Sequence, residues 1–101
     1  MYQINYNQPV HIHFIGIGGI SMSGLAAVLL GRGFTVSGSD AKQSPLTDWL
    51  VSLGARISYP QSAANVTDDI DVVVYTAAIH ADNPEFAAVQ AKNIPMLSRA
   101  E

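Results

Sequence analysis

The sequence predicts an α/β fold built on one parallel sheet, and three observations lead to that fold class. Apolar runs of strand length alternate with helix-like runs along all 101 residues, which favours parallel strands joined by right-handed crossovers. The first apolar run enters a glycine-rich turn that opens into a helix. Only 13% of the residues are charged, as is typical of strands buried on both faces. These features predict a Rossmann-like, five-stranded sheet with helices on both faces and strand order 3-2-1-4-5.

The first predicted strand and helix flank the glycine turn. The apolar run over 10–15 predicts a strand, which Pro9 stops from extending backwards. The helix is expected over 19–32 and ends near Gly33, a residue type favoured just after a helix. Residues 1–9 are expected to be a lead-in to the strand.

The second strand is expected over 34–38, and a helix follows it. Ser44 can cap that helix, with Pro45 at its first position, and Gly54 ends it. Its apolar side chains recur at helical spacing and are predicted to lie in the core. These side chains are Leu46, Trp49, Leu50 and Leu53.

The second half of the chain repeats the alternation. A short strand is expected over 55–59, a polar loop over 60–69 and the strongest strand over 71–76. Asn83 and Pro84 start the third helix, in which Glu85 and Lys92 suit the helix dipole. The last strand, over 94–97, is expected at a sheet edge because Pro95 cannot donate a hydrogen bond.

Composition excludes several classes of protein. The net charge is −3 and no Lys/Arg cluster exists, which argues against a nucleic-acid surface. The absence of cysteine excludes disulfides and thiolate metal sites. No apolar run is long enough to span a bilayer, and no signal peptide is visible. We therefore expect one cytoplasmic domain over 1–101, with no membrane partner.

The glycine turn predicts a pocket for a phosphorylated ligand. Its glycines allow a tight turn and close approach of a phosphate, and the helix dipole favours an anion there. A tight turn without a ligand is the alternative. The spacing Gly16-x-Gly18-x-x-Ser21 departs from the dinucleotide fingerprint, whose third glycine is replaced. The residues assigned to this part of the site are Gly16, Gly18, Gly19, Ile20, Ser21, Met22 and Ser23.

Two loops at the carboxyl ends of neighbouring strands should complete the pocket. Asp40, which closes the second strand, could bind a ribose hydroxyl or be an ordinary loop aspartate. Small residues after the fourth strand leave room for a ligand, although a simple loop explains them equally well. The residues of this second loop are Thr76, Ala77, Ala78, Ile79 and His80.

Other polar residues favour a structural role. His11 and His13 alternate on one face of the first strand, where hydrogen bonding within the protein is more plausible than metal binding. An acidic stretch over 68–71 suggests a solvated loop rather than a cation site. No metal site and no catalytic residue is predicted in this chain.

The chain resembles the bacterial Mur ligases, and its alanine-adding members fit best. The resemblance begins with residues 13–26, which read HFIGIGGISMSGLA, and the run 22–24 is far more specific than a bare dinucleotide fingerprint. Two departures are Ser21, where the family commonly has glycine, and Pro60-Gln61, where it commonly has Gly-His. The similarity continues in order through 36–40, Thr47, 54–55, 71–74, 78–79, 83–85, 94–95 and 99–101.

The resemblance implies that this chain is the first domain of a three-domain, ATP-dependent ligase that builds cell-wall peptidoglycan. Such a domain holds the UDP part of UDP-N-acetylmuramate and catalyses nothing alone. Residues 18–23 would take the diphosphate, Asp40 the ribose or uracil side, and 76–79 the opposite wall. ATP and Mg²⁺ would belong to the missing central and C-terminal domains. The alternatives are an NAD(P)-binding domain of an oxidoreductase or redox sensor, and a nucleotide-sensing interaction module.

Overall fold

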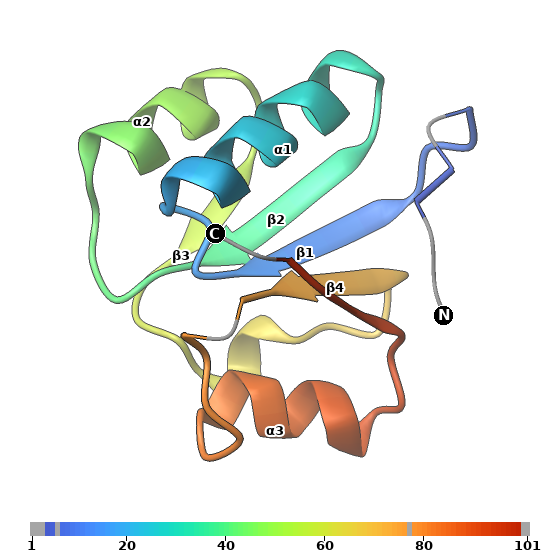
Figure 1. The fold of residues 1–101 in the computed structure, drawn as a ribbon, viewed down its shortest axis with the longest axis vertical. Coiled ribbons are helices and arrows are strands. Elements are labelled where there is room, and N and C mark those ends of the chain that lie inside the picture. Colours follow the sequence, from blue (N-terminus) through green and yellow to red (C-terminus); the bar gives the residue numbers. More distant parts are fainter. Residues whose placement is uncertain (1–3, 6, 77, 100–101) are drawn as a thin grey trace.

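The predicted alternation of strands and helices is confirmed. The computed structural model describes residues 4–5, 7–76 and 78–99 (Figure 1). A single 3₁₀ turn, η1, falls in the loop that the sequence predicts between the third and fourth strands. The elements are β1 (His11–Ile15), α1 (Ile20–Gly31), β2 (Thr35–Ser39), α2 (Pro45–Ser52), β3 (Arg56–Ser58), η1 (Ala63–Asn65), β4 (Val72–Tyr75), α3 (Pro84–Ala91) and β5 (Met96–Ser98).

The sheet has the predicted order, β3-β2-β1-β4-β5, and every pair of neighbours is parallel. β1 is central, with Phe14 opposite Gly38 on one side and Val74 on the other. β5 lies at an edge, as Pro95 predicts, and the carbonyl of Pro95 accepts a hydrogen bond of 2.9 Å from the N–H of Val73. All strands therefore deliver their carboxyl ends to the same side of the molecule.

Helices cover both faces of the sheet, as predicted. α1 and α2 lie on one face, and α3 with η1 lies on the other (Figure 1). Each face has its own buried apolar cluster. The larger one, around Phe14, Met22 and Leu29, packs beneath α1, and the smaller one, around Ile15, Val73 and Phe86, packs against α3. Part of the predicted lead-in contributes, since Ile4 packs against the larger cluster.

The predicted core positions of α2 need a correction. Leu50 is fully buried, but Trp49 is 46% exposed and Leu53 is 44% exposed. The buried side of this short helix is instead defined by Thr47 and Leu50, three residues apart. α2 lies over the β3 edge and contacts α1, so only a narrow stripe of the helix meets the protein.

Local signals place the starts of α2 and α3 as predicted. Ser44 and Thr47 form a reciprocal capping box, with Pro45 at the first helical position. The Asn83 side chain accepts hydrogen bonds from the first backbone N–H groups of α3, at 2.9 and 3.2 Å. None of the described helices is long and apolar enough to cross a membrane.

Candidate functional site

The glycine turn between β1 and α1 uses its own backbone N–H groups within the chain. Gly16 has φ +85°, a conformation that side chains disfavour, so glycine is needed there. The N–H groups of Gly16 and Ile17 donate to the Ser39 carbonyl at 2.9 and 3.0 Å, and Gly19 donates to the Gly16 carbonyl at 3.3 Å. The turn is thus folded onto the end of β2, and these donors are already satisfied.

Asp40 lies directly on the glycine turn. Its Oδ2 accepts a hydrogen bond of 2.8 Å from the N–H of Gly18, and its Oδ1 accepts one from Ala41. A Cβ on Gly18 would lie 2.6 Å from that Oδ2 and 3.2 Å from Thr47 Cγ2. Gly18 therefore lets the carboxylate and α2 approach the turn closely, and the two predicted parts of the site meet here.

The first turn of α1 follows directly on the glycine turn, and the start of a helix is a position that favours anions. The first N–H groups of a helix have no partner within the helix, and Gly19, at the N-cap, has no side chain to supply one. The Ile20 side chain at this turn is 86% exposed. The Met22 side chain is fully buried and belongs to the core. Ser23 is also buried, and its hydroxyl donates a hydrogen bond of 3.0 Å to the Ile20 carbonyl.

The loop after β4 comes up against the glycine turn. A Cβ on Gly16 would lie 3.8 Å from Ile79 Cδ1, an ordinary van der Waals contact. Thr76 is buried, and its carbonyl accepts a hydrogen bond of 3.0 Å from the Ile79 N–H. Ala78 and His80 are exposed, whereas Ala77 lies outside the described residues. The structure thus brings Thr76, Ile79 and the turn together, and leaves His80 in solvent.

Arg99 joins this site, which the sequence did not predict. Its Nε donates a hydrogen bond of 2.8 Å to Ser21 Oγ, and its N–H donates one of 2.8 Å to the Tyr75 carbonyl. A guanidinium is thereby placed at the start of α1. The topology offered a signal: β5 pairs with β4, so a residue just after β5 lies at the same end of the sheet as the glycine turn.

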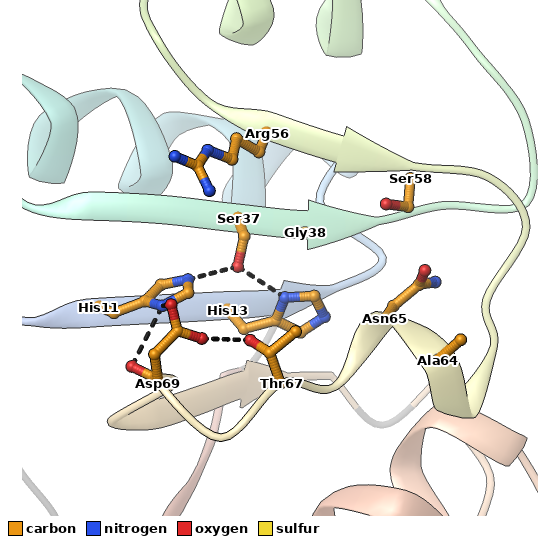
Figure 2. Close-up of a pocket in the computed structure, with 10 residues that line it drawn as sticks. All are labelled: His11, His13, Ser37, Gly38, Arg56, Ser58, Ala64, Asn65, Thr67 and Asp69. Atoms are coloured by element: carbon orange, nitrogen blue, oxygen red, sulfur yellow. Dashed lines mark hydrogen bonds and ion pairs between the residues drawn. The ribbon is translucent and has the colours of Figure 1, made fainter.

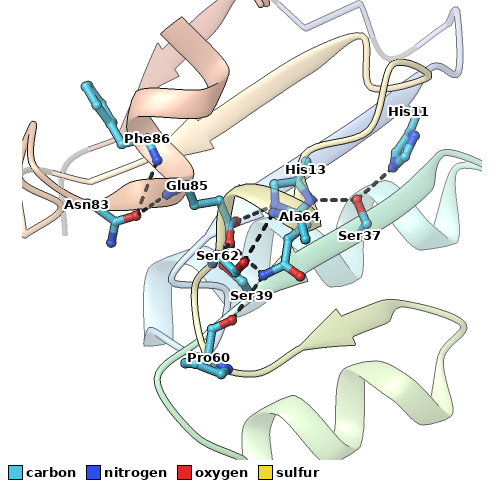
Figure 3. A network of polar contacts seen from close by, with 11 residues as sticks. His11, His13, Ser37, Ser39, Pro60, Ser62, Ala64, Asn83, Glu85 and Phe86 are labelled. Atoms are coloured by element: carbon cyan, nitrogen blue, oxygen red, sulfur yellow. Dashed lines mark hydrogen bonds and ion pairs between the residues drawn. The ribbon is translucent and has the colours of Figure 1, made fainter. Parts of the chain in front are cut away.

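A second missed residue is Glu85, whose carboxylate is fully buried in a polar network (Figure 3). Oε2 accepts hydrogen bonds of 2.6 Å from both His13 Nε2 and Ser39 Oγ. Oε1 accepts one of 3.1 Å from the Ser62 N–H and one of 2.8 Å from Asn65 Nδ2. One carboxylate therefore ties α3 to β1, to the end of β2 and to the segment around η1.

These contacts predict acid sensitivity. Burial alone raises the pKa of Glu85, but hydrogen bonds from His13, Ser39 and Asn65 outweigh it and hold the pKa below the ordinary 4.5. A lowered pKa stabilises the folded state above that value, and the contribution is lost as pH falls through the folded pKa. We expect the thermal midpoint to drop below about pH 4.5. The drop should be smaller in Glu85→Gln, and equal drops in both proteins would contradict this assignment.

His11 and His13 have the structural role predicted for them. Both rings contact the Ser37 hydroxyl, at 2.7 and 2.8 Å. Asp71 accepts a hydrogen bond of 2.7 Å from the His11 N–H, and Asp68 pairs with Lys92 Nζ at 2.7 Å. Within the described part of the chain, no group of three His, Cys, Asp or Glu side chains could hold a metal ion.

A cavity of about 340 Å³ lies away from the glycine turn, over β1, β2 and β3 (Figure 2). It contains none of the residues that the sequence assigned to the ligand. Its lining is polar, with imidazole, hydroxyl, amide, guanidinium and carboxylate groups. The lining residues are His11, His13, Ser37, Gly38, Arg56, Ser58, Ala64, Asn65, Thr67 and Asp69.

The parallel sheet, the glycine turn and the loops packed around it define a Rossmann-like domain. The chain belongs to the Mur ligase family: the family's catalytic-domain pattern matches residues 11–101. The resemblance seen in the sequence is thus confirmed.

Individual relatives agree with that membership. The UDP-N-acetylmuramate–L-alanine ligase of Lachnospira eligens is 65% identical over 101 residues, and that of Agathobacter rectalis is 63% identical. The crystal structure of the UDP-N-acetylmuramate–alanine ligase of Thermotoga maritima superposes with a TM-score of 0.83 at 39% identity, over 88% of this chain and 20% of that one. The match covers all of this chain but only 22% of each of the first two relatives.

Proposed function

We propose that this chain is the UDP-sugar-binding domain of an ATP-dependent ligase that joins L-alanine to UDP-N-acetylmuramate in peptidoglycan synthesis. The observation that carries the proposal is that Arg99 contacts the first turn of α1, while the loop after β4 packs against the glycine turn just before that helix. Donor N–H groups, the positive end of the helix dipole and a guanidinium together suit a diphosphate. The names of the relatives supply the substrate to which that diphosphate belongs.

The geometry suggests which role in ligand binding each part of the site has. The N–H groups of Gly16 to Gly19 hold the turn in shape, since they already have partners in the chain. The start of α1, where the Ile20 side chain is exposed, is then the part of the turn assigned to the diphosphate. Asp40 is assigned to the ribose or uracil side, and Thr76 and Ile79 of the loop after β4 to the opposite wall. Arg99 adds a positive charge to the diphosphate position.

Catalysis is assigned outside this chain. The described residues include no cluster that could bind Mg²⁺, and the sequence has no Gly-x-x-x-x-Gly-Lys-Ser/Thr phosphate loop for ATP. We therefore place ATP and Mg²⁺ on the remainder of the ligase. The role of this domain is to position the UDP-sugar so that its carboxylate reaches that remainder.

Calorimetry with UDP-N-acetylmuramate and with NAD tests the proposal. We expect binding of the UDP-sugar, and Arg99→Ala should weaken it by about ten- to a hundredfold, because a hydrogen bond to a charged group contributes about 1.5–3 kcal/mol. Arg56→Ala is the matched control, since Arg56 lies on β3 and lines the separate cavity. Tight NAD binding without a response to the UDP-sugar would refute the proposal, and equal losses in the two variants would remove Arg99 from the site.

A further inference from the structure

A continuous chain of hydrogen bonds crosses the sheet face from the cavity to the buried carboxylate of Glu85 (Figures 2 and 3). It begins at the backbone carbonyl of Asp69, which lies 3.2 Å from His11 Nδ1. His11 Nε2 is 2.7 Å from Ser37 Oγ, which is 2.8 Å from His13 Nδ1. His13 Nε2 is 2.6 Å from Glu85 Oε2. We call this chain the relay: it consists of His11, Ser37 and His13, with the Asp69 carbonyl at one end and the Glu85 carboxylate at the other.

Both ends of the relay accept hydrogen bonds. A peptide carbonyl can only accept, and an ionised carboxylate can only accept. The four contacts therefore require four hydrogens from the two rings and the serine between them. Two neutral imidazoles carry one N–H each and the hydroxyl carries one hydrogen, which makes three. The relay is one hydrogen short when both rings are neutral.

We propose that His11 and His13 together hold one extra proton at neutral pH, which neutralises the buried Glu85 carboxylate. If the proton lies on His11, Ser37 donates to His13; if it lies on His13, Ser37 donates to His11. The Glu85 carboxylate stays ionised, because its hydrogen bonds hold its pKa below the ordinary value. The two rings therefore carry three hydrogens in total, whichever of them holds the extra proton.

The charged groups around the relay favour keeping this proton. Asp69 and Asp71 face His11 from the loop before β4, with Asp69 Oδ2 3.6 Å from Nδ1 and Asp71 Oδ2 2.7 Å from the backbone nitrogen. Glu85 faces His13 from α3. Arg56, on β3, lines the same cavity and is the opposing positive charge. Three carboxylates and one guanidinium give these surroundings a net negative charge, which favours one further positive charge on the relay.

Loss of the proton has a structural consequence. With three hydrogens for four contacts, one link must fail, and it costs least where water can replace it. His13 is only 2% exposed, whereas the His11 side chain is 13% exposed and borders the cavity. We therefore place the break at His11, so that alkaline pH releases its ring from Ser37 or from the Asp69 carbonyl. The relay makes the cavity wall sensitive to pH.

NMR of the ring nitrogens in ¹⁵N-histidine-labelled protein tests the proton count directly. At about pH 7, the four nitrogens of His11 and His13 are expected to carry three hydrogens in total. Exposed His80 lies outside the relay and provides a reference ring, and His80→Gln assigns its signals. A total of two, meaning two neutral rings, would overturn the proposal, as would a total of four. This measurement needs no variant in the relay.

Glu85→Gln is the matched variant. A glutamine amide can itself donate to His13 Nε2, which supplies the missing hydrogen and lets all four contacts persist with two neutral rings. The total should therefore fall from three to two in this variant. A total that stays at three would show that the extra proton is not held by the Glu85 carboxylate, and would contradict the proposal.

Discussion

Glu85→Ala is expected to lower the free energy of unfolding by about 3–5 kcal/mol, the usual cost of removing one partner from a buried charged pair. The carboxylate accepts hydrogen bonds from His13, Ser39, Ser62 and Asn65. Its removal leaves these donors without an acceptor, and His13 and Ser39 are buried where water does not replace it. A domain of this size is stable by about 5–15 kcal/mol, so the variant should approach the limit of folding.

Urea unfolding of the wild type and the variant measures this loss. Glu85→Gln should cost less, because the amide keeps an acceptor toward Ser62 and Asn65. Asp68→Ala is the surface control: its carboxylate is 92% exposed, and loss of its pair with Lys92 should change stability by at most about 1 kcal/mol. If Glu85→Ala cost no more than Asp68→Ala, the network would not be a support of the fold.

Glu85 also shows where sequence reasoning stops. At the second position of a helix, an acidic residue is explained fully by the helix dipole, which is how the sequence accounts for it. Its actual partner, His13, lies 72 residues earlier in the chain. Periodicity predicts that His13 is on a strand, but no local pattern tells which residue of α3 meets that strand. Such a pairing depends on how α3 crosses the sheet.

Elements and topology were predictable because each rests on local chemistry. Alternating strands and helices, proline at helix starts and glycine at helix ends all act within a few residues. The side of α2 that is buried was not predictable in the same way, and Trp49 shows this: its spacing suits a core position, yet it is 46% exposed. Its exposure depends on α2 lying over a sheet edge, which is a property of the assembled fold.

In the candidate site too, features formed by contiguous residues were predictable and features formed by distant residues were not. Its glycine turn was visible in the sequence, because turn glycines and the following helix are contiguous. The contact of Asp40 with the Gly18 N–H was not visible, since the sequence left Asp40 either as a ligand of a ribose hydroxyl or as an ordinary loop aspartate. Arg99 was missed because it enters through the pairing of β5 with β4 and through one contact with Ser21. Residues that reach the site from other strands of the sheet can be identified only once the structure is known.

Gly38→Ala is expected to destabilise the protein by about 1–3 kcal/mol, as insertion of a methyl group into a packed core does. A Cβ on Gly38 would lie 2.7 Å from Ile17 Cδ1, 2.8 Å from Ile17 Cβ and 3.0 Å from the Phe14 carbonyl oxygen. Neither neighbour yields easily: Ile17 is fully buried, and the carbonyl belongs to the central strand β1. The methyl group must therefore push Ile17, and with it the glycine turn.

The displacement of Ile17 predicts a second effect, on binding. Because Ile17 lies between Gly16 and Gly18, Gly38→Ala should also weaken binding of the proposed UDP-sugar ligand in calorimetry, although Gly38 is on the neighbouring strand. Gly24→Ala is the matched control, since a Cβ there meets nothing within 4 Å. It should stabilise α1 by about 0.5–1 kcal/mol through helix propensity alone. Urea unfolding measures the free energy of unfolding of both variants, which should fall in Gly38→Ala and rise in Gly24→Ala. An equal gain in stability would show that β2 tolerates a side chain at Gly38.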